Sequence, residues 1–227
     1  GDRDALRQTV DTLVASGLLL RFEQGSERIY SIDPAKHAMA SYYRGTIVHH
    51  FLDRAMIEVA LFGLRDADGD GRAAFWASID RLRDLFKFEF FYPPRDVHRA
   101  AIAAELGRID GKWEARLESG ARGVHQLLRR CQPLVGHAAL LQYAEAYSVV
   151  FDLLVRLDDG IAPDEKAICE AALAEGRQAY LLRRISSEAA IGKLLFANGF
   201  ALARHSGLTG ATDAAQRSGR RAMLREL

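Results

Sequence analysis

The helical spacing of the apolar residues is the feature that most restricts how this chain can fold. Apolar side chains recur every three or four positions through most of the 227 residues, a spacing that places them on one face of an α-helix. Leu6, Val10 and Val14 start the pattern, and Tyr143 and Tyr147 belong to a long helix further on. The spacing predicts a mostly α-helical, multi-helix protein with seven to nine helices.

One segment near the N-terminus departs from this spacing. Residues 18–22 and 28–32 are short apolar runs on either side of a turn that contains Gly25, and this order predicts a small β-hairpin. Gly17 is expected to end the helix before it. Residues 1–33 are therefore predicted to be a helix plus hairpin, either the end of a preceding domain or a winged-helix-like unit.

The winged-helix interpretation would make the chain a DNA-binding regulator. A recognition helix should be basic, yet Arg3 and Arg7 are offset by Asp2, Asp4 and Asp11, so attraction to phosphates would be weak. The whole chain has 31 Lys and Arg against 30 Asp and Glu, which gives no general attraction to nucleic acid or anionic lipid. We expect no nucleic-acid partner, and the DNA-binding regulator and a stand-alone helical scaffold remain the alternatives.

Most of the remaining chain is predicted to be one helical domain, residues 34–210, followed by a basic tail at 211–227. Asp33 and Pro34 are a helix start signal, and we expect one unbroken helix to Leu64, since Gly45 costs only about 1 kcal/mol relative to Ala. We expect a looser stretch around Trp113, and a deeply buried helix at 191–202 because it is apolar nearly all round.

The cysteines, the apolar runs and the acidic loop argue against several kinds of site. The only two cysteines cannot form a disulfide framework. The most apolar run, 133–155, contains Glu145 and Asp152, so we predict no transmembrane helix. A Ca²⁺-loop pattern at Asp66, Asp68, Asp70 and Gly71 has Ala77 where the bidentate Glu should stand.

Other signature motifs are missing or out of context. Gly69, Gly71 and Ala74 have the spacing of a dinucleotide fingerprint but no strand before them. The sequence has no nucleophile-elbow, zinc, Walker or Cys-x-x-Cys motif. We therefore predict no metal site and no cofactor.

Three short groups are candidates for contact with another domain or a membrane. Tyr42, Tyr43 and Arg44 suit either phosphate binding or an amphipathic helix face. Asp53 follows His49 by four residues, so its carboxylate could orient that imidazole, but we expect His49 and His50 to be partly buried in a helix interface. In the aromatic run 86–92, core packing is favoured over a membrane-surface element. We expect the contact residues to be Tyr42, Tyr43, Arg44, His49, His50, Phe90 and Phe91.

Several segments resemble one family. Residues 40–51, ASYYRGTIVHHF, are similar to the Y-Y-R-N-x-I-x-H stretch of the bacterial membrane-associated glycerol-3-phosphate acyltransferases, with Gly45 in place of the Asn. Residues 82–90, LRDLFKFEF, resemble the family's LRDLLKFEFF segment. Gly176 to Gln178, Arg183 with Arg184, and residues 193–198 resemble segments near the family's C-terminal end.

The resemblance implies transfer of a fatty acyl group from acyl-CoA or acyl-carrier protein to the 1-hydroxyl of glycerol 3-phosphate, at the cytoplasmic face of the inner membrane. The family's catalytic H-x₄-D motif is not in this chain, because His49 and Asp53 are one residue too close. We therefore expect no catalytic and no substrate-binding residue here. The chain is interpreted as the helical C-terminal region of such an enzyme, inactive alone, and its start without Met as the edge of a longer polypeptide.

Overall fold

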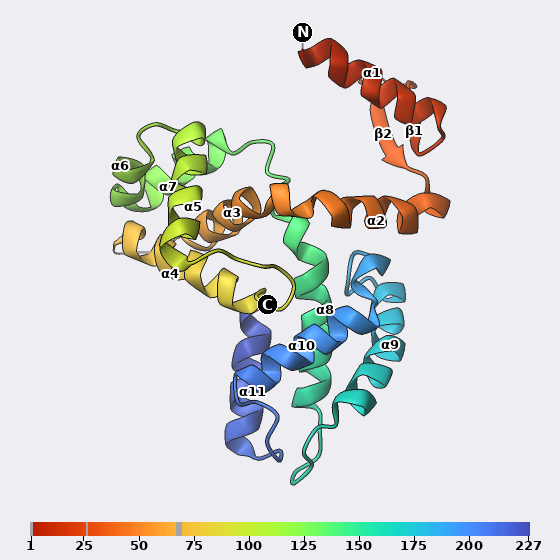
Figure 1. The fold of residues 1–227 in the computed structure, drawn as a ribbon, viewed down its shortest axis with the longest axis vertical. Coiled ribbons are helices and arrows are strands. Elements are labelled where there is room, and N and C mark those ends of the chain that lie inside the picture. Colours follow the sequence, from red (N-terminus) through yellow and green to blue (C-terminus); the bar gives the residue numbers. More distant parts are fainter. Residues whose placement is uncertain (1, 26, 67–69) are drawn as a thin grey trace. The chain divides into compact units, whose positions relative to one another are not determined.

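The computed structural model describes residues 2–25, 27–66 and 70–227. Within these ranges the chain forms eleven α-helices, three short 3₁₀ helices and one two-stranded sheet (Figure 1). This confirms the mostly helical fold with one small hairpin near the N-terminus, whereas the expected number of seven to nine helices is too low. Contacts divide the chain into two compact units, Gly1–Val48 and His49–Leu227, called here the N-terminal and the C-terminal unit. This boundary lies after Val48 and not after residue 33, where the sequence pattern predicted it. The helix that follows the hairpin therefore belongs to the same unit as the hairpin.

The N-terminal unit follows the predicted order of helix, hairpin and helix. Its elements are α1 (Asp2–Ala15), β1 (Leu19–Phe22), β2 (Ile29–Ile32), the 3₁₀ helix η1 (Pro34–Lys36) and α2 (His37–Ile47). The strands are antiparallel, with Leu19 opposite Ile32 and Phe22 opposite Ile29. Gly17 ends α1 in the left-handed conformation, at φ 69°, which a residue without a Cβ adopts at little cost.

The described part of the N-terminal unit buries very little of its apolar surface. All four residues of β2 and three of the four in β1 are exposed, and Leu6 is 65% exposed. Val48 is the one residue of this unit that the structure describes as buried. A two-stranded hairpin with one helix beside it offers too little apolar area for a core.

The unbroken helix expected over 34–64 is wrong. α2 ends at Ile47, the 3₁₀ helix η2 covers Val48–His50, and α3 (Leu52–Gly63) starts after Phe51. Residues 45–51 join a glycine to β-branched, histidine and phenylalanine residues, all weak helix formers. The Thr46 hydroxyl also donates a hydrogen bond to the Tyr43 carbonyl at 2.7 Å. Such side-chain hydrogen bonds compete with those of the helix backbone.

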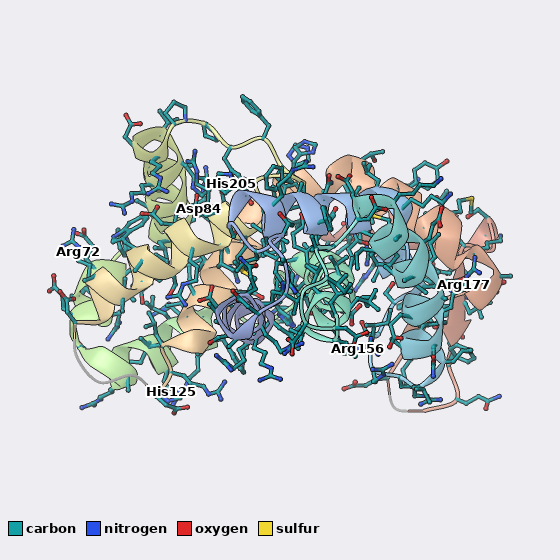
Figure 2. All side chains as sticks on the ribbon, turned by 90° about the horizontal axis from the view of Figure 1, so that it is seen from below. Arg72, Asp84, His125, Arg156, Arg177 and His205 are labelled. Atoms are coloured by element: carbon teal, nitrogen blue, oxygen red, sulfur yellow. The ribbon has the colours of Figure 1, made fainter. Side chains whose placement is uncertain are left out.

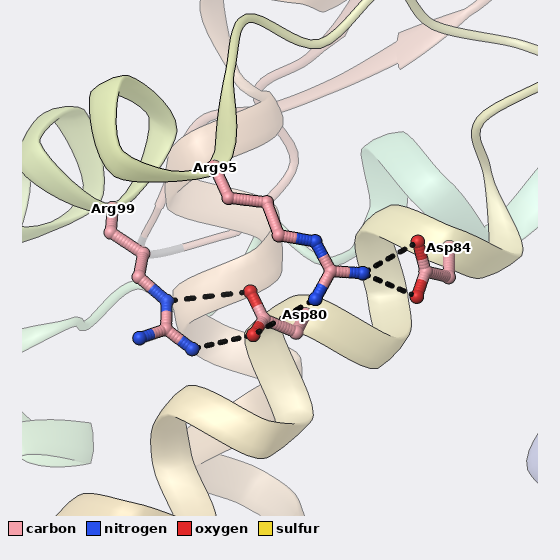
Figure 3. Close-up of polar contacts among 4 residues, drawn as sticks. All are labelled: Asp80, Asp84, Arg95 and Arg99. Atoms are coloured by element: carbon pink, nitrogen blue, oxygen red, sulfur yellow. Dashed lines mark hydrogen bonds and ion pairs between the residues drawn. The ribbon is translucent and has the colours of Figure 1, made fainter.

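The first half of the C-terminal unit surrounds α3, which packs against α4, α5 and α7. These helices and the short α6 are α4 (Gly71–Leu85), α5 (Arg95–Ile109), α6 (Trp113–Glu118) and α7 (Gly120–Arg130). The looser stretch expected around Trp113 is therefore wrong, since this residue starts α6. Arg95 and Arg99 of α5 pair with Asp80 and Asp84 of α4 (Figure 3), with 3.0 Å between Arg95 Nη2 and Asp84 Oδ2.

The loop before α4 serves as a helix cap. The Asp70 carboxylate accepts hydrogen bonds from the backbone N–H groups of Arg72 and Ala73 at 2.9 and 3.1 Å, which satisfies donors that the first turn leaves open. Asp68, a member of the Ca²⁺-loop pattern, and Gly69 of the dinucleotide pattern lie outside the described residues. Among the described residues, no group of three or more His, Cys, Asp or Glu side chains could hold a metal ion.

The second half of the C-terminal unit is built on α8 (Ala138–Val155), which packs against α9, α10 and α11 (Figure 1). The partners are α9 (Glu165–Leu181), the 3₁₀ helix η3 (Glu188–Ala190), α10 (Lys193–His205) and α11 (Ala214–Glu226). By length and composition α8 could cross a membrane, but half of that segment is buried inside the protein. A helix at the centre of a folded core has the same composition.

The last helix differs from the expected basic tail. α11 occupies Ala214–Glu226, and its Arg220 is fully buried. The Arg220 guanidinium donates hydrogen bonds to the carbonyls of Leu154, Leu208 and Gly210, each at 2.9 Å, and to the Thr212 hydroxyl at 2.8 Å. Basic residues at 217–225 therefore do not form one free surface, because Arg220 ties α11 into the core.

Candidate functional site

The seven residues predicted to contact another domain or a membrane do not form one described group. Tyr43 and Arg44 lie on α2 of the N-terminal unit, where Tyr43 is 58% exposed. The side chain of Tyr42 lies outside the described residues. His49, His50, Phe90 and Phe91 belong to the C-terminal unit. The prediction that these residues contact a partner stays a prediction.

The histidine pair is exposed, so the partly buried helix interface expected for it is wrong. The ring centroids of His49 and His50 are 3.9 Å apart. Asp53 does not pair with His49 but lies near His98 of α5, with 3.6 Å between Asp53 Oδ1 and His98 Nε2. The helical spacing behind the His49 prediction is lost because η2 and Phe51 interrupt the helix.

The aromatic run 86–92 divides between core and surface. Phe86 is buried, with its ring 6.0 Å from that of Tyr147, and Phe90 lies 4.9 Å from Tyr143 in an edge-on contact. Phe91 is 99% exposed. Core packing is thus correct for Phe86 and wrong for Phe91, because the segment is an irregular connection between α4 and α5 whose successive side chains point in different directions.

A partly buried polar cluster, which the sequence did not reveal, joins residues of this run to Tyr147 of α8 and Asn198 of α10. Burial raises the pKa of the Glu89 carboxyl above its ordinary value, and the side chains of Tyr147 and Asn198 lower it to a smaller degree. Burial also raises the pKa of the hydroxyls of Tyr92 and Tyr147.

The cluster brings together two of the segments that resemble the acyltransferases. Glu89 belongs to the segment 82–90 and Asn198 to the segment 193–198, which lie on opposite sides of α8 in sequence. A polar residue inside an apolar run was the available signal, since a lone Glu between phenylalanines needs a polar partner if it is buried. Side chains of these two segments therefore meet in the C-terminal unit.

An exposed apolar edge occurs where α9 ends and α10 begins. We call Leu181, Leu182 and Leu194 the leucine edge; they are 80%, 60% and 73% exposed. α9 packs against α10, and a Cβ at Gly176 of α9 would lie 3.2 Å from the Phe196 ring of α10. Deep burial of the helix at 191–202 is thus only partly correct, because Phe196 and Phe200 are buried and Leu194 is not.

The chain turn beside the leucine edge carries cationic side chains. Arg183 has a positive φ of 55°, a conformation that non-glycine residues adopt mainly at helix C-termini and turns. Its side chain is exposed, whereas Arg184 pairs with Glu175 at 2.9 Å. Exposed leucines next to a guanidinium are typical of a surface that contacts an apolar partner or a lipid interface.

The hairpin of the N-terminal unit exposes a second apolar surface. We call the directly paired Phe22 and Ile29, which are 51% and 62% exposed, the hairpin surface; Tyr30 and Ile32, 40% and 38% exposed, lie on the opposite face of the two strands. Arg21 of β1 pairs with Asp11 and with Glu23, each at 3.2 Å, and Arg28 pairs with Glu23 at 3.3 Å. Because carboxylates compensate its cations, this hairpin is better suited to a protein partner than to DNA phosphates.

The chain is similar over almost its full length to one family model and to several curated sequences. Residues 1–212 match the family described as the glycerol-3-phosphate acyltransferase C-terminal region. The chain is 31% identical over 223 residues to "Putative acyltransferase plsB1" of Mycobacterium bovis and of two strains of Mycobacterium tuberculosis. The match covers 97% of this chain and 36% of each relative, so the chain spans about a third of their length. No solved structure matches it.

Proposed function

Because the chain belongs to the family of glycerol-3-phosphate acyltransferase C-terminal regions, we propose that it docks onto the catalytic domain of such an enzyme and positions that domain at the membrane. The enzyme would transfer an acyl group from acyl-CoA or acyl-carrier protein to the 1-hydroxyl of glycerol 3-phosphate. The catalytic domain would be carried by the same polypeptide, in the part to which this chain does not correspond. The chain by itself is expected to be inactive.

The exposed hairpin surface is the observation that carries the docking half of the proposal. Phe22 and Ile29 are directly paired across the strands, so they form one continuous apolar patch. Burying a side chain of this size contributes about 1.5–3 kcal/mol. A partner attached by the same polypeptide also loses less entropy on docking than a free one. The hairpin surface would therefore be covered when the catalytic domain is present.

The leucine edge supports the membrane half of the proposal. Leucine side chains can enter the acyl boundary of a bilayer while a neighbouring arginine such as Arg183 extends its charge to the headgroups. This would place this chain peripherally at the cytoplasmic face of the inner membrane, with none of its own helices crossing the bilayer. The two contact surfaces lie in different units, so each can be tested by itself.

The docking half is tested by co-purification of this chain with a separately expressed catalytic domain of its parent enzyme. Phe22→Ser in the hairpin surface should reduce recovery of the complex and its acyl transfer to glycerol 3-phosphate. Phe62→Ser on α3 is the matched control, because Phe62 and Phe22 are 53% and 51% exposed. Equal recovery of both variants, or acyl transfer by this chain alone, would overturn the docking role.

The membrane half is tested by co-sedimentation of the chain with vesicles that contain phosphatidylglycerol. A variant with Leu181→Ser and Leu194→Ser should remain in the supernatant, because it loses both ends of the leucine edge. Leu141→Ser, at a 42% exposed leucine of α8, should sediment like the wild type. If the wild type itself fails to sediment, only the docking role is left.

A further inference from the structure

A basic recess lies on α7 of the C-terminal unit. Arg122, His125, Gln126 and Arg129 line an open recess of about 550 Å³. Their spacing of three and four residues places them on one stripe of the helix, and His125 lies at the periphery of the C-terminal unit in Figure 2. The opposite stripe, with Val124 and Leu127, is buried.

The lining of this recess offers N–H donors and positive charge. The guanidinium groups of Arg122 and Arg129 present several donors each in a planar arrangement. Arg116 Nη1 donates to Gln126 Oε1, which leaves the amide N–H₂ of Gln126 as a donor. None of the four side chains supplies an acidic oxygen. Such a donor set favours an anion with several acceptor oxygens over a metal cation.

The two arginines of the recess also differ from most arginines of the C-terminal unit. Arg95 and Arg99, for example, are engaged by two aspartates (Figure 3). In the described ranges, neither Arg122 nor Arg129 lies within ion-pair distance of a carboxylate, whereas Arg130 next to them is 2.9 Å from Asp110. The charge of the recess is therefore not compensated locally and is available to a ligand.

The recess stands on a fixed support. Gly123 lies so close to the backbone carbonyl of Arg116 that a Cβ could not be placed there without moving α6 or α7. Asp110 accepts a hydrogen bond from the Lys112 backbone N–H at 2.9 Å and pairs with Arg130 of α7, which links the start of α6 to the end of α7. Arg122 lies in the first turn of α7, where the helix dipole adds positive potential. Prearranged donors bind with a lower entropy cost.

We propose that the α7 recess binds the phosphate group of an anionic ligand. Bidentate contacts from Arg122 and Arg129 would hold the phosphate oxygens, and Gln126 and His125 would complete the donor set. The phosphate could come from a small soluble phosphate compound or from a lipid headgroup at a bilayer surface. The same side chains would serve in both cases, and the two sources are separated by experiment.

The first arm of the test is an NMR titration of the 227-residue chain with inorganic phosphate. We expect saturable shifts of the α7 amide signals. A variant with Arg122→Gln and Arg129→Gln should bind phosphate at least about tenfold more weakly, because two charge-assisted contacts are lost. A variant with Arg221→Gln and Arg225→Gln is the matched control, because it removes the same charge from two exposed arginines of α11. The control should titrate like the wild type.

The second arm replaces inorganic phosphate by vesicles of phosphatidylglycerol or of phosphatidylcholine. If the α7 variant no longer binds phosphatidylglycerol vesicles and the α11 control still does, the ligand is a lipid headgroup. If the α7 variant binds these vesicles like the control but binds inorganic phosphate more weakly, the ligand is a soluble phosphate compound. If neither probe distinguishes the α7 variant from the α11 control, the proposal is overturned. Because no catalytic domain is present and the leucine edge is intact, this failure is distinct from failure of the proposed function.

Discussion

The two units of this protein bury their apolar residues to very different degrees. In the C-terminal unit Phe75, Tyr147 and Phe196 are fully buried, and even Arg220 is buried among hydrogen-bond acceptors. In the described part of the N-terminal unit, Val48 is the only buried residue. Both units have regular elements, so the difference shows that correct local structure does not by itself make a core. A segment of this kind is expected to need a partner.

Replacing one phenylalanine in each unit is the most sensitive test of this difference in burial. Phe75→Ala should lower the free energy of unfolding of the C-terminal unit by about 3–5 kcal/mol, the usual cost of a large cavity. Phe22→Ala should change the stability of the chain by less than about 0.5 kcal/mol, since Phe22 is already half exposed. Urea unfolding followed by tryptophan fluorescence measures the first effect, because Trp76 and Trp113 both lie in the C-terminal unit.

Amide hydrogen exchange measures the second effect, in α1 and the hairpin. Exchange there should be fast in the wild type and nearly unchanged by Phe22→Ala, because few buried contacts protect these amides. Slow exchange in the hairpin that Phe22→Ala abolishes would show that the N-terminal unit has a cooperative core, and the comparison between the units would fail.

The buried arginine gives the next largest effect. Arg220→Ala removes four hydrogen bonds and leaves three backbone carbonyls without that donor, so we expect a loss of about 3 kcal/mol or more in unfolding free energy. Arg221→Ala, at the exposed neighbouring position, should cost less than about 0.5 kcal/mol. Similar urea midpoints for the two variants would mean that α11 contributes little to the C-terminal unit.

The close approach of α6 and α7 predicts a smaller effect of opposite sign at two glycines. Gly123→Ala should destabilise the C-terminal unit by about 1–3 kcal/mol, because the new methyl group meets the Arg116 carbonyl. Gly107→Ala on α5, where nothing lies within 4 Å of the added Cβ, should stabilise it by up to about 1 kcal/mol through helix propensity. Thermal melting of both variants measures the difference, and equal melting temperatures would contradict the tight packing at Gly123.

The smallest effect is a pH dependence at Glu89. Because burial raises the pKa of Glu89 in the folded state, the folded protein holds a proton that the unfolded chain releases. Stability therefore falls as the pH rises from the ordinary Glu value near 4.5 through the folded pKa. Glu89→Gln removes this loss, so the variant should gain stability relative to the wild type over that rise in pH.

Urea midpoints measured between about pH 4 and pH 8 test this expectation. Glu170→Gln on α9 controls for the loss of one carboxylate at an exposed position. A Glu89→Gln variant that loses stability relative to the wild type as the pH rises would show that the ionised carboxylate is the favoured form in the folded protein. Glu89 would then be a stabilising contact of the core and not a group that burial penalises.

Local signals predicted the elements that depend on local physics. Gly17 ends α1, and the two apolar runs on either side of Gly25 form the hairpin. The prediction of an unbroken helix failed at residues 45–51, where several weak helix formers follow one another. The sequence also offered no sign that Arg220 is buried, because a buried arginine cannot be recognised from its charge.

For the candidate contact residues, too, the sequence predicted the chemistry of the side chains but not their exposure. The sequence identified aromatic and basic groups of suitable chemistry, but it could not separate Phe86 in the core from Phe91 at the surface. The leucine edge and the α7 recess were missed because exposed leucines and unpaired arginines have ordinary helical spacing. Which face of a helix is covered depends on its neighbours and not on its own pattern.

The sequence by itself determined the helical class, the position of the hairpin and the family resemblance, because periodicity, turn residues and shared segments are properties of nearby residues. Only the tertiary structure decided that Glu89 and Asn198 share a partly buried cluster, that Arg220 lies in the core, and that the hairpin surface is exposed. These outcomes depend on contacts between residues far apart in the chain, where burial and hydrogen-bond partners are set.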